Sequence, residues 1–221
     1  MTAENDREFH RHLARRILFV AAATGVYGAV LAVWRSPLMA AYVAVKLPMV
    51  FVGATFLVSL FCWMASLAAG AGLRYREVLE AVFFAMSVAG AILLAMAPVV
   101  LLLVFSAAPD SGTRETMRMT HSAMLFAHIV VMAGSGTIGV ALLYRSLRRR
   151  VPAGCRLVLM MCLWLAAFAV VGCQLGWIMR PLVGSPNIAV EFLRSNALES
   201  NFLESLFTQI IPHLFNGGAV R

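Results

Sequence analysis

Five long runs of apolar residues dominate this sequence, and none of them contains an aspartate or a glutamate. At a rise of about 1.5 Å per residue, a helix of each length would cross most or all of the ~30 Å hydrocarbon layer of a bilayer. The runs are continuous rather than alternating, which favours helices over barrel strands. The sequence therefore predicts an all-α polytopic integral membrane protein with about five transmembrane helices, over residues 17–34, 48–73, 81–107, 121–143 and 157–179.

The charge content agrees with this prediction. Apolar residues make up 62% of the chain and charged residues 13%, whereas soluble domains carry about 25% charged residues. The net charge is +8, and in a soluble protein such an excess would suggest nucleic acid. Here the cations lie at the ends of apolar runs, as membrane topology requires. We therefore expect the lipid bilayer as a partner and no nucleic acid.

The basic residues also predict an orientation, because cytoplasmic loops are enriched in Lys and Arg. With the N-terminus inside, eleven basic residues fall on the cytoplasmic face and seven on the other. Residues 1–16 would form a cytoplasmic segment, and residues 180–221 an extracytoplasmic tail. The preference for Arg over Lys and the many alanines suggest a GC-rich bacterial genome. The expected location is the bacterial cytoplasmic (inner) membrane.

The start of the second run has a less certain boundary. Pro48 is expected in the first turn of that span, where a missing amide proton costs little. Residues 37–45 form a short apolar piece that would either lie at the membrane interface or extend the helix. Lys46, between the two, is counted with the extracytoplasmic cations.

The last run ends in a pattern typical of a membrane exit. Trp177 suits an aromatic belt at headgroup level. Arg180 follows about one turn later, where its guanidinium can reach water or phosphate. Pro181 then ends the helix.

The tail is predicted to contain an amphipathic helix over residues 196–211. Its apolar residues recur at helical spacing, Asn196 and Glu199 resemble a capping box, and Pro212 stops the pattern. This helix has no basic residue, so anionic lipid would not attract it. We therefore favour docking on a protein surface rather than binding to the membrane surface. The docking side chains would be Leu198, Phe202, Leu206, Phe207 and Ile210.

The sequence offers little chemistry. It has no H-E-x-x-H, G-x-S-x-G or Walker motif, so we assign no catalytic residue, no metal site and no cofactor, and we expect no enzyme. His121 and His128 lie seven residues apart on one helix face. They are the only candidate ligands for a haem, chlorophyll or metal. The alternative, which we favour, is one interfacial histidine and one polar contact between helices.

Small residues cluster in two spans. Such residues let membrane helices approach closely. The pattern predicts a helix-packing interface, either within the chain or with a partner subunit or second copy. We favour packing within the chain, because five helices must pack on one another. The residues are Gly134, Ser135, Gly136 and Gly139 in the fourth run, and Ser87 and Ala91 in the third.

A short stretch resembles a family of uncharacterised bacterial multi-span membrane proteins. These share an L-G-W-x-x-R-P-x-x-G-x-P exit, a Phe-rich segment and an Asn-Phe pair. Lys46 to Pro48 and Ala97 to Val99 also look similar to that family. The resemblance implies the same membrane architecture and no particular reaction. Its matching exit and tail positions are Leu175, Gly176, Trp177, Arg180, Pro181, Gly184, Pro186, Phe192, Asn201 and Phe202.

The expected function is a non-enzymatic integral subunit or scaffold of a larger membrane assembly. The lack of catalytic groups, the small polar portion and the apolar tail helix favour it. One alternative is an oligomeric channel or facilitator for an ion or small solute. A second is a membrane cofactor-binding subunit that uses His121 and His128.

Overall fold

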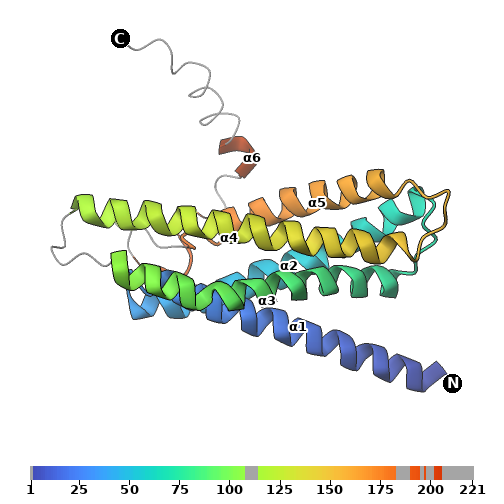
Figure 1. Cartoon of the computed structure of the whole chain (residues 1–221), viewed down its shortest axis with the longest axis horizontal. Coiled ribbons are helices and arrows are strands. Elements are labelled where there is room, and N and C mark those ends of the chain that lie inside the picture. Colours follow the sequence, from blue (N-terminus) through green and yellow to red (C-terminus); the bar gives the residue numbers. More distant parts are fainter. Residues whose placement is uncertain (1, 108–113, 183–189, 195–196, 198–201, 206–221) are drawn as a thin grey trace, which may run out of the picture.

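The fold is entirely helical in the part of the chain that the structure describes. The computed structural model describes residues 2–107, 114–182, 190–194, 197 and 202–205. Consecutive long helices run in alternating directions (Figure 1). The helices are α1 (Thr2–Ala32), α2 (Pro37–Ala68), α3 (Tyr75–Ala107), α4 (Arg114–Arg148), α5 (Leu157–Ile178) and the short α6 (Phe202–Ser205).

Five of these helices are long and apolar enough to cross a membrane. The shortest of them, α5, has 22 residues and would extend about 33 Å, slightly more than the ~30 Å of a hydrocarbon core. The prediction of an all-α polytopic membrane protein with about five spans is thereby confirmed.

The helix α2 begins earlier than the sequence suggested. Ser36 caps its N-terminus, because the Ser36 hydroxyl accepts a hydrogen bond from the Met39 amide at 3.1 Å, and Pro37 occupies the first turn. Residues 37–45 therefore extend the second helix. The prediction that Pro48 lies in the first turn is wrong, since Pro48 lies inside α2.

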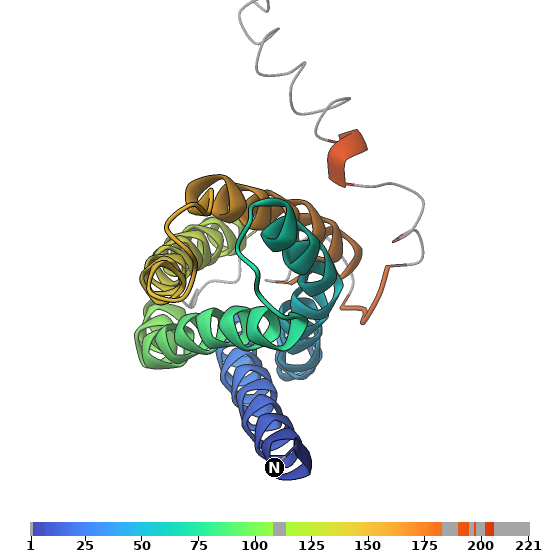
Figure 2. The ribbon, with the colours of Figure 1, turned by 90° about the vertical axis from the view of Figure 1, so that its right-hand side faces the viewer.

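The helices form an open ring with α1 on its outside. Viewed end-on in Figure 2, α2, α3, α4 and α5 surround a centre, and α1 lies against α2 and α3. In addition, α4 packs on α3, and α5 packs on α2. In contrast, α4 and α5 scarcely touch. The ring is thus weakly closed between α4 and α5.

Glycines bring the outer helix close to its neighbours. A Cβ atom added to Gly28 of α1 would lie 2.8 Å from the Val43 carbonyl oxygen of α2, and one added to Gly25 would lie 3.0 Å from that of Ala44. Both distances are too short for an ordinary side chain. The tight packing of α1 on α2 therefore depends on these two glycines.

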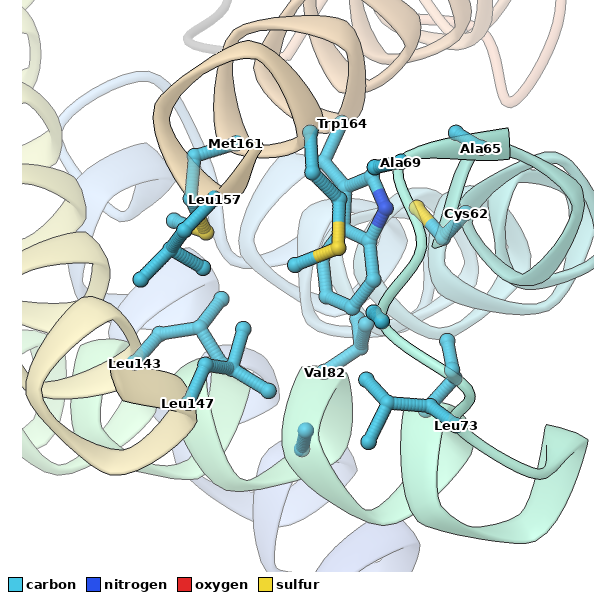
Figure 3. Close-up of a cluster of buried hydrophobic side chains, with 14 of the residues drawn as sticks. Cys62, Ala65, Ala69, Leu73, Val82, Leu143, Leu147, Leu157, Met161 and Trp164 are labelled. Carbon is cyan, nitrogen blue, oxygen red and sulfur yellow. The ribbon is translucent and has the colours of Figure 1, made fainter. Parts of the chain in front are cut away.

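The largest buried cluster lies at the end of the bundle that holds the α2–α3 and α4–α5 connections (Figure 3). Trp164 of α5, which is 1% exposed, lies between side chains from α2, α3 and α4. The two connections are also joined directly, because the Arg156 amide donates to the Ala69 carbonyl at 3.1 Å. This end of the ring is closed by apolar packing.

Candidate functional site

Lys46, the one lysine of the chain, is completely buried. It lies inside α2, because residues 37–45 extend that helix to Pro37. Its ammonium group donates to the carbonyl oxygens of Pro181 and Glu191, each at 3.4 Å. A buried cation in a membrane helix is costly and usually has a defined partner. Here the partners are two backbone carbonyls of the segment that follows α5.

Aromatic rings complete the surroundings of this ammonium group. The Lys46 nitrogen lies 5.3 Å from the centroid of the Phe192 ring, within the range of a cation–π contact. Tyr42, one turn earlier in α2, meets Phe192 edge-on at 5.5 Å. Among the described residues no carboxylate pairs with Lys46. We call Lys46, Tyr42, Pro181, Glu191 and Phe192 the lysine clasp.

The helix α5 ends at Ile178, where the exit pattern begins. The Arg180 guanidinium carbon lies 3.0 Å from the centroid of the Trp177 ring, and its Nε donates to the Trp177 carbonyl at 3.3 Å. Burial and the nearby Arg194 lower the pKa of Arg180 from its usual value. The Trp177 and Arg180 side chains therefore fold onto each other, and Pro181 continues into the lysine clasp.

The tail begins against the end of α5. The Gln174 side-chain oxygen accepts a hydrogen bond from the Phe202 amide at 3.0 Å, and the Trp177 and Phe202 rings meet edge-on at 6.1 Å. Of the predicted helix over residues 196–211, the structure describes Ala197, which lies in a turn, and α6, which has four residues. The other predicted docking positions lie outside the described residues, namely Leu198, Leu206, Phe207 and Ile210.

The two candidate ligand histidines contact aromatic residues of α1 and of the turn that follows it. The Nδ1 atom of His128 lies 3.3 Å from the hydroxyl of the buried Tyr27, and the two rings stack at 5.8 Å. His121 lies against Trp34, with ring centroids 5.9 Å apart. No group of three or more His, Cys, Asp or Glu residues among those described could hold a metal ion. The role of His121 and His128 as cofactor ligands stays a prediction.

The small residues of α4 have unequal surroundings. Gly139 packs on α3, where an added Cβ would lie 3.0 Å from the Ala85 carbonyl oxygen. Ser135 is buried, and its hydroxyl donates to the Met132 carbonyl of its own helix at 3.0 Å. Gly134 and Gly136 have no described neighbour within 4 Å of an added Cβ.

The two small residues predicted in α3 differ in exposure, and Ser87 is half-buried. The Ser87 hydroxyl donates to the Phe83 carbonyl within α3 at 2.7 Å, and Ala91 is exposed. The contact of α3 with α1 in this region is at Gly90, where an added Cβ would lie 3.5 Å from Ala23 of α1. The contact therefore falls one residue before Ala91.

A cavity of about 470 Å³ lies between α3, α4 and α5. Its walls are almost entirely apolar, and Thr137 supplies the one side-chain hydroxyl. It extends from the core cluster of Figure 3, with which it shares Trp164 and Leu143. The cavity lies beside the weak contact between α4 and α5. We call it the inter-helix cavity. The small residues in its wall are Ala85, Ala89, Ala133, Gly136 and Gly139.

Comparison with protein-family models, curated proteins and solved structures found no match to this chain. The resemblance of the exit motif to a family of multi-span proteins therefore stays a prediction. The structure does bring several positions of that resemblance together. Lys46 and Pro181 meet in the lysine clasp, with Phe192 beside them, and Trp177 contacts Phe202.

The sequence reasoning missed the lysine clasp and the glycines of α1. The signal for the first was present: Ser36 and Pro37 form a helix start, which places Lys46 inside a span. The signal for the second was the pair Gly25 and Gly28 in an apolar run. Neither signal identifies the contacting residues, because these come from other parts of the chain.

Proposed function

We propose that this protein is a non-enzymatic integral subunit of a larger membrane assembly, and that a transmembrane helix of a partner packs over the inter-helix cavity and places side chains in it. The observation that carries this proposal is the cavity of about 470 Å³ beside two helices that scarcely touch. Only 11% of the apolar stretch of α4 and 17% of that of α5 is buried, against 33% or more for the other three spans. These two helices therefore have the most surface left for a partner.

The lining of the cavity favours a helix as the partner element that packs over it. Small residues allow a helix backbone to approach closely, which drives association where there is no hydrophobic effect between helices. Ala85 and Ala89 of α3 and Gly136 of α4 provide such a wall. An aqueous channel needs polar lining groups, and the cavity walls are almost entirely apolar. The channel alternative gains no support from this cavity and stays a prediction.

The proposed setting is the bacterial cytoplasmic membrane, with the N-terminus inside. Its support is the bias of basic residues in the sequence and the five helices that could span a membrane. An odd number of crossings puts the two termini on opposite sides. Reporter tags at each end, tested with a membrane-impermeant label in intact cells, would check this orientation. Equal labelling of the two ends would contradict the odd number of crossings.

A matched pair of glycine variants tests the proposed cavity. Gly136 lines the cavity, whereas Gly134 does not, and an added Cβ meets no described neighbour within 4 Å at either position. Gly136→Leu should project a branched side chain into the cavity and reduce the amount of partner that copurifies in mild detergent. Gly134→Leu, on the same helix, should leave copurification unchanged.

Native mass measurement of the purified protein gives the readout. We expect a hetero-complex for the unaltered chain and for Gly134→Leu, and mostly the single chain for Gly136→Leu. A single chain in all three preparations would contradict the subunit proposal. Equal complexes in all three would place the partner elsewhere on the protein and contradict the cavity as its site.

A further inference from the structure

Two adjoining hollows lie where α4 ends in a run of arginines. The first has a volume of about 190 Å³ and the second of about 370 Å³. Phe84, Ser146 and Arg150 line both, so the two hollows form one continuous site. We call it the arginine hollow. Further arginines line it, namely Arg16 of α1 on the first side, and Arg145 of α4 and Arg149 of the turn after α4 on the second.

The arginine hollow is strongly basic. Its walls contain four arginines and one acid, Glu80. Arg16 is held in place, because its guanidinium donates to the Glu80 backbone carbonyl at 2.7 Å and lies 5.6 Å from the centroid of the Phe84 ring. In the part of the chain that the structure describes, no carboxylate pairs with the other three arginines. The hollow therefore favours an anionic ligand.

The position of the hollow along the helices indicates where that ligand lies. With 35 residues, α4 would be about 52 Å long and extend about 11 Å beyond the hydrocarbon at each end if it is centred. Arg145 lies about one turn from the end of α4, at the level of lipid headgroups. Phe84, nine residues after the start of α3, lies about 14 Å from that start, at the edge of the hydrocarbon.

We propose that the arginine hollow binds an anionic membrane phospholipid. Arg145, Arg149 and Arg150 would hold the phosphate, since guanidinium groups bind phosphate oxygens through paired hydrogen bonds. Phe84 and Leu142, which also line the hollow, would contact the upper part of the acyl chains. A free phosphate ion has no group to place on that apolar wall, which is why we assign the site to a lipid.

The experiment compares two double variants that lose the same charge from the same end of the protein. Arg145→Gln with Arg149→Gln removes two arginines of the hollow. Arg148→Gln with Arg156→Gln removes two exposed arginines that line neither hollow. The purified proteins in mild detergent would be titrated with phosphatidylglycerol, phosphatidylcholine and inorganic phosphate. Native mass spectrometry counts bound lipid, and thermal unfolding measures stabilisation.

We expect the unaltered chain to retain phosphatidylglycerol in preference to phosphatidylcholine. The Arg145 and Arg149 variant should bind it about thirtyfold more weakly, since each of the two arginines near a membrane surface contributes roughly 1 kcal/mol. The Arg148 and Arg156 variant should bind it normally. Equal weakening in both variants would overturn the proposal, because general charge would then explain binding. Equal stabilisation by inorganic phosphate without lipid would overturn the assignment to a phospholipid.

Discussion

The ammonium nitrogen of Lys46 and the backbone carbonyl oxygen of Pro181 lie 3.4 Å apart, although 135 residues separate them in the sequence. Lys46 belongs to α2, and Pro181 follows α5, so the contact joins two helices at the end where the chain leaves the bundle. A buried ammonium group must be hydrogen-bonded. The lysine clasp therefore fixes the path of the chain after α5.

Removal of this ammonium group should release the segment after α5. Lys46→Met keeps an unbranched apolar side chain and removes both hydrogen bonds to the Pro181 and Glu191 carbonyls. We expect amide hydrogen exchange across residues 190–194 to become roughly fivefold faster, which corresponds to about 1 kcal/mol of lost interaction. Exchange in α3 should stay unchanged.

Arg148→Met is the control for this variant, since Arg148 is exposed at the opposite end of the bundle. It should leave exchange in residues 190–194 as it is in the unaltered chain. Unchanged protection of this segment in Lys46→Met would show that the clasp does not hold it.

The hydrogen bond from Phe202 to Gln174 should hold α6 against α5. Gln174→Leu removes the acceptor of the Phe202 amide, whereas Gln174→Glu keeps a side-chain oxygen there. We expect limited proteolysis to cleave the tail several-fold faster in Gln174→Leu and only slightly faster in Gln174→Glu. The same cleavage rate in Gln174→Leu and the unaltered chain would mean that this bond does not anchor the tail.

Gly28 should be intolerant of even a methyl group. In Gly28→Ala the new Cβ would lie 2.8 Å from a backbone carbonyl oxygen of α2, so the helices must separate, at a cost of about 1–3 kcal/mol. Gly134→Ala meets no described atom within 4 Å, and alanine is the better helix former by about 1 kcal/mol. Thermal unfolding in detergent should therefore move in opposite directions for the two variants. A Gly28→Ala protein as stable as the unaltered chain would contradict the close packing of α1 on α2.

The contact between Tyr27 and His128 should stabilise the pairing of α1 with α4. Tyr27→Phe removes the hydroxyl that lies 3.3 Å from His128 Nδ1 and keeps the ring. We expect a loss of about 0.6 kcal/mol, the average for a hydrogen bond between membrane helices. A double-mutant cycle with His128→Phe measures the coupling, and a coupling energy of zero would contradict the contact.

The same histidine permits a test of cofactor binding. We expect the purified protein to show no visible absorption band, because His128 already contacts Tyr27 and stacks on its ring. A haem or chlorophyll band that disappears in His128→Phe would instead support the cofactor-binding alternative.

Much of the architecture could be predicted because it follows from the solvent. A backbone in hydrocarbon must satisfy its hydrogen bonds internally, so each long apolar run becomes a helix. The helix boundaries were less predictable where few polar residues mark them. At α2, for example, the N-cap Ser36 precedes the predicted apolar run by many residues. The candidate site was only partly predictable. The end of α5 beside Trp177 and Arg180 could be expected from their order in the sequence, but the contacts of Lys46 could not.

The sequence by itself determined that this chain consists of membrane-crossing helices, because its apolar runs leave no other way to satisfy the backbone. Only the tertiary structure decided which helices are neighbours. In lipid, apolar surface does not distinguish one helix face from another, so close approaches and polar contacts decide the packing. That is why Gly28 against Val43, and Lys46 against Pro181, became visible only once the helices were placed together.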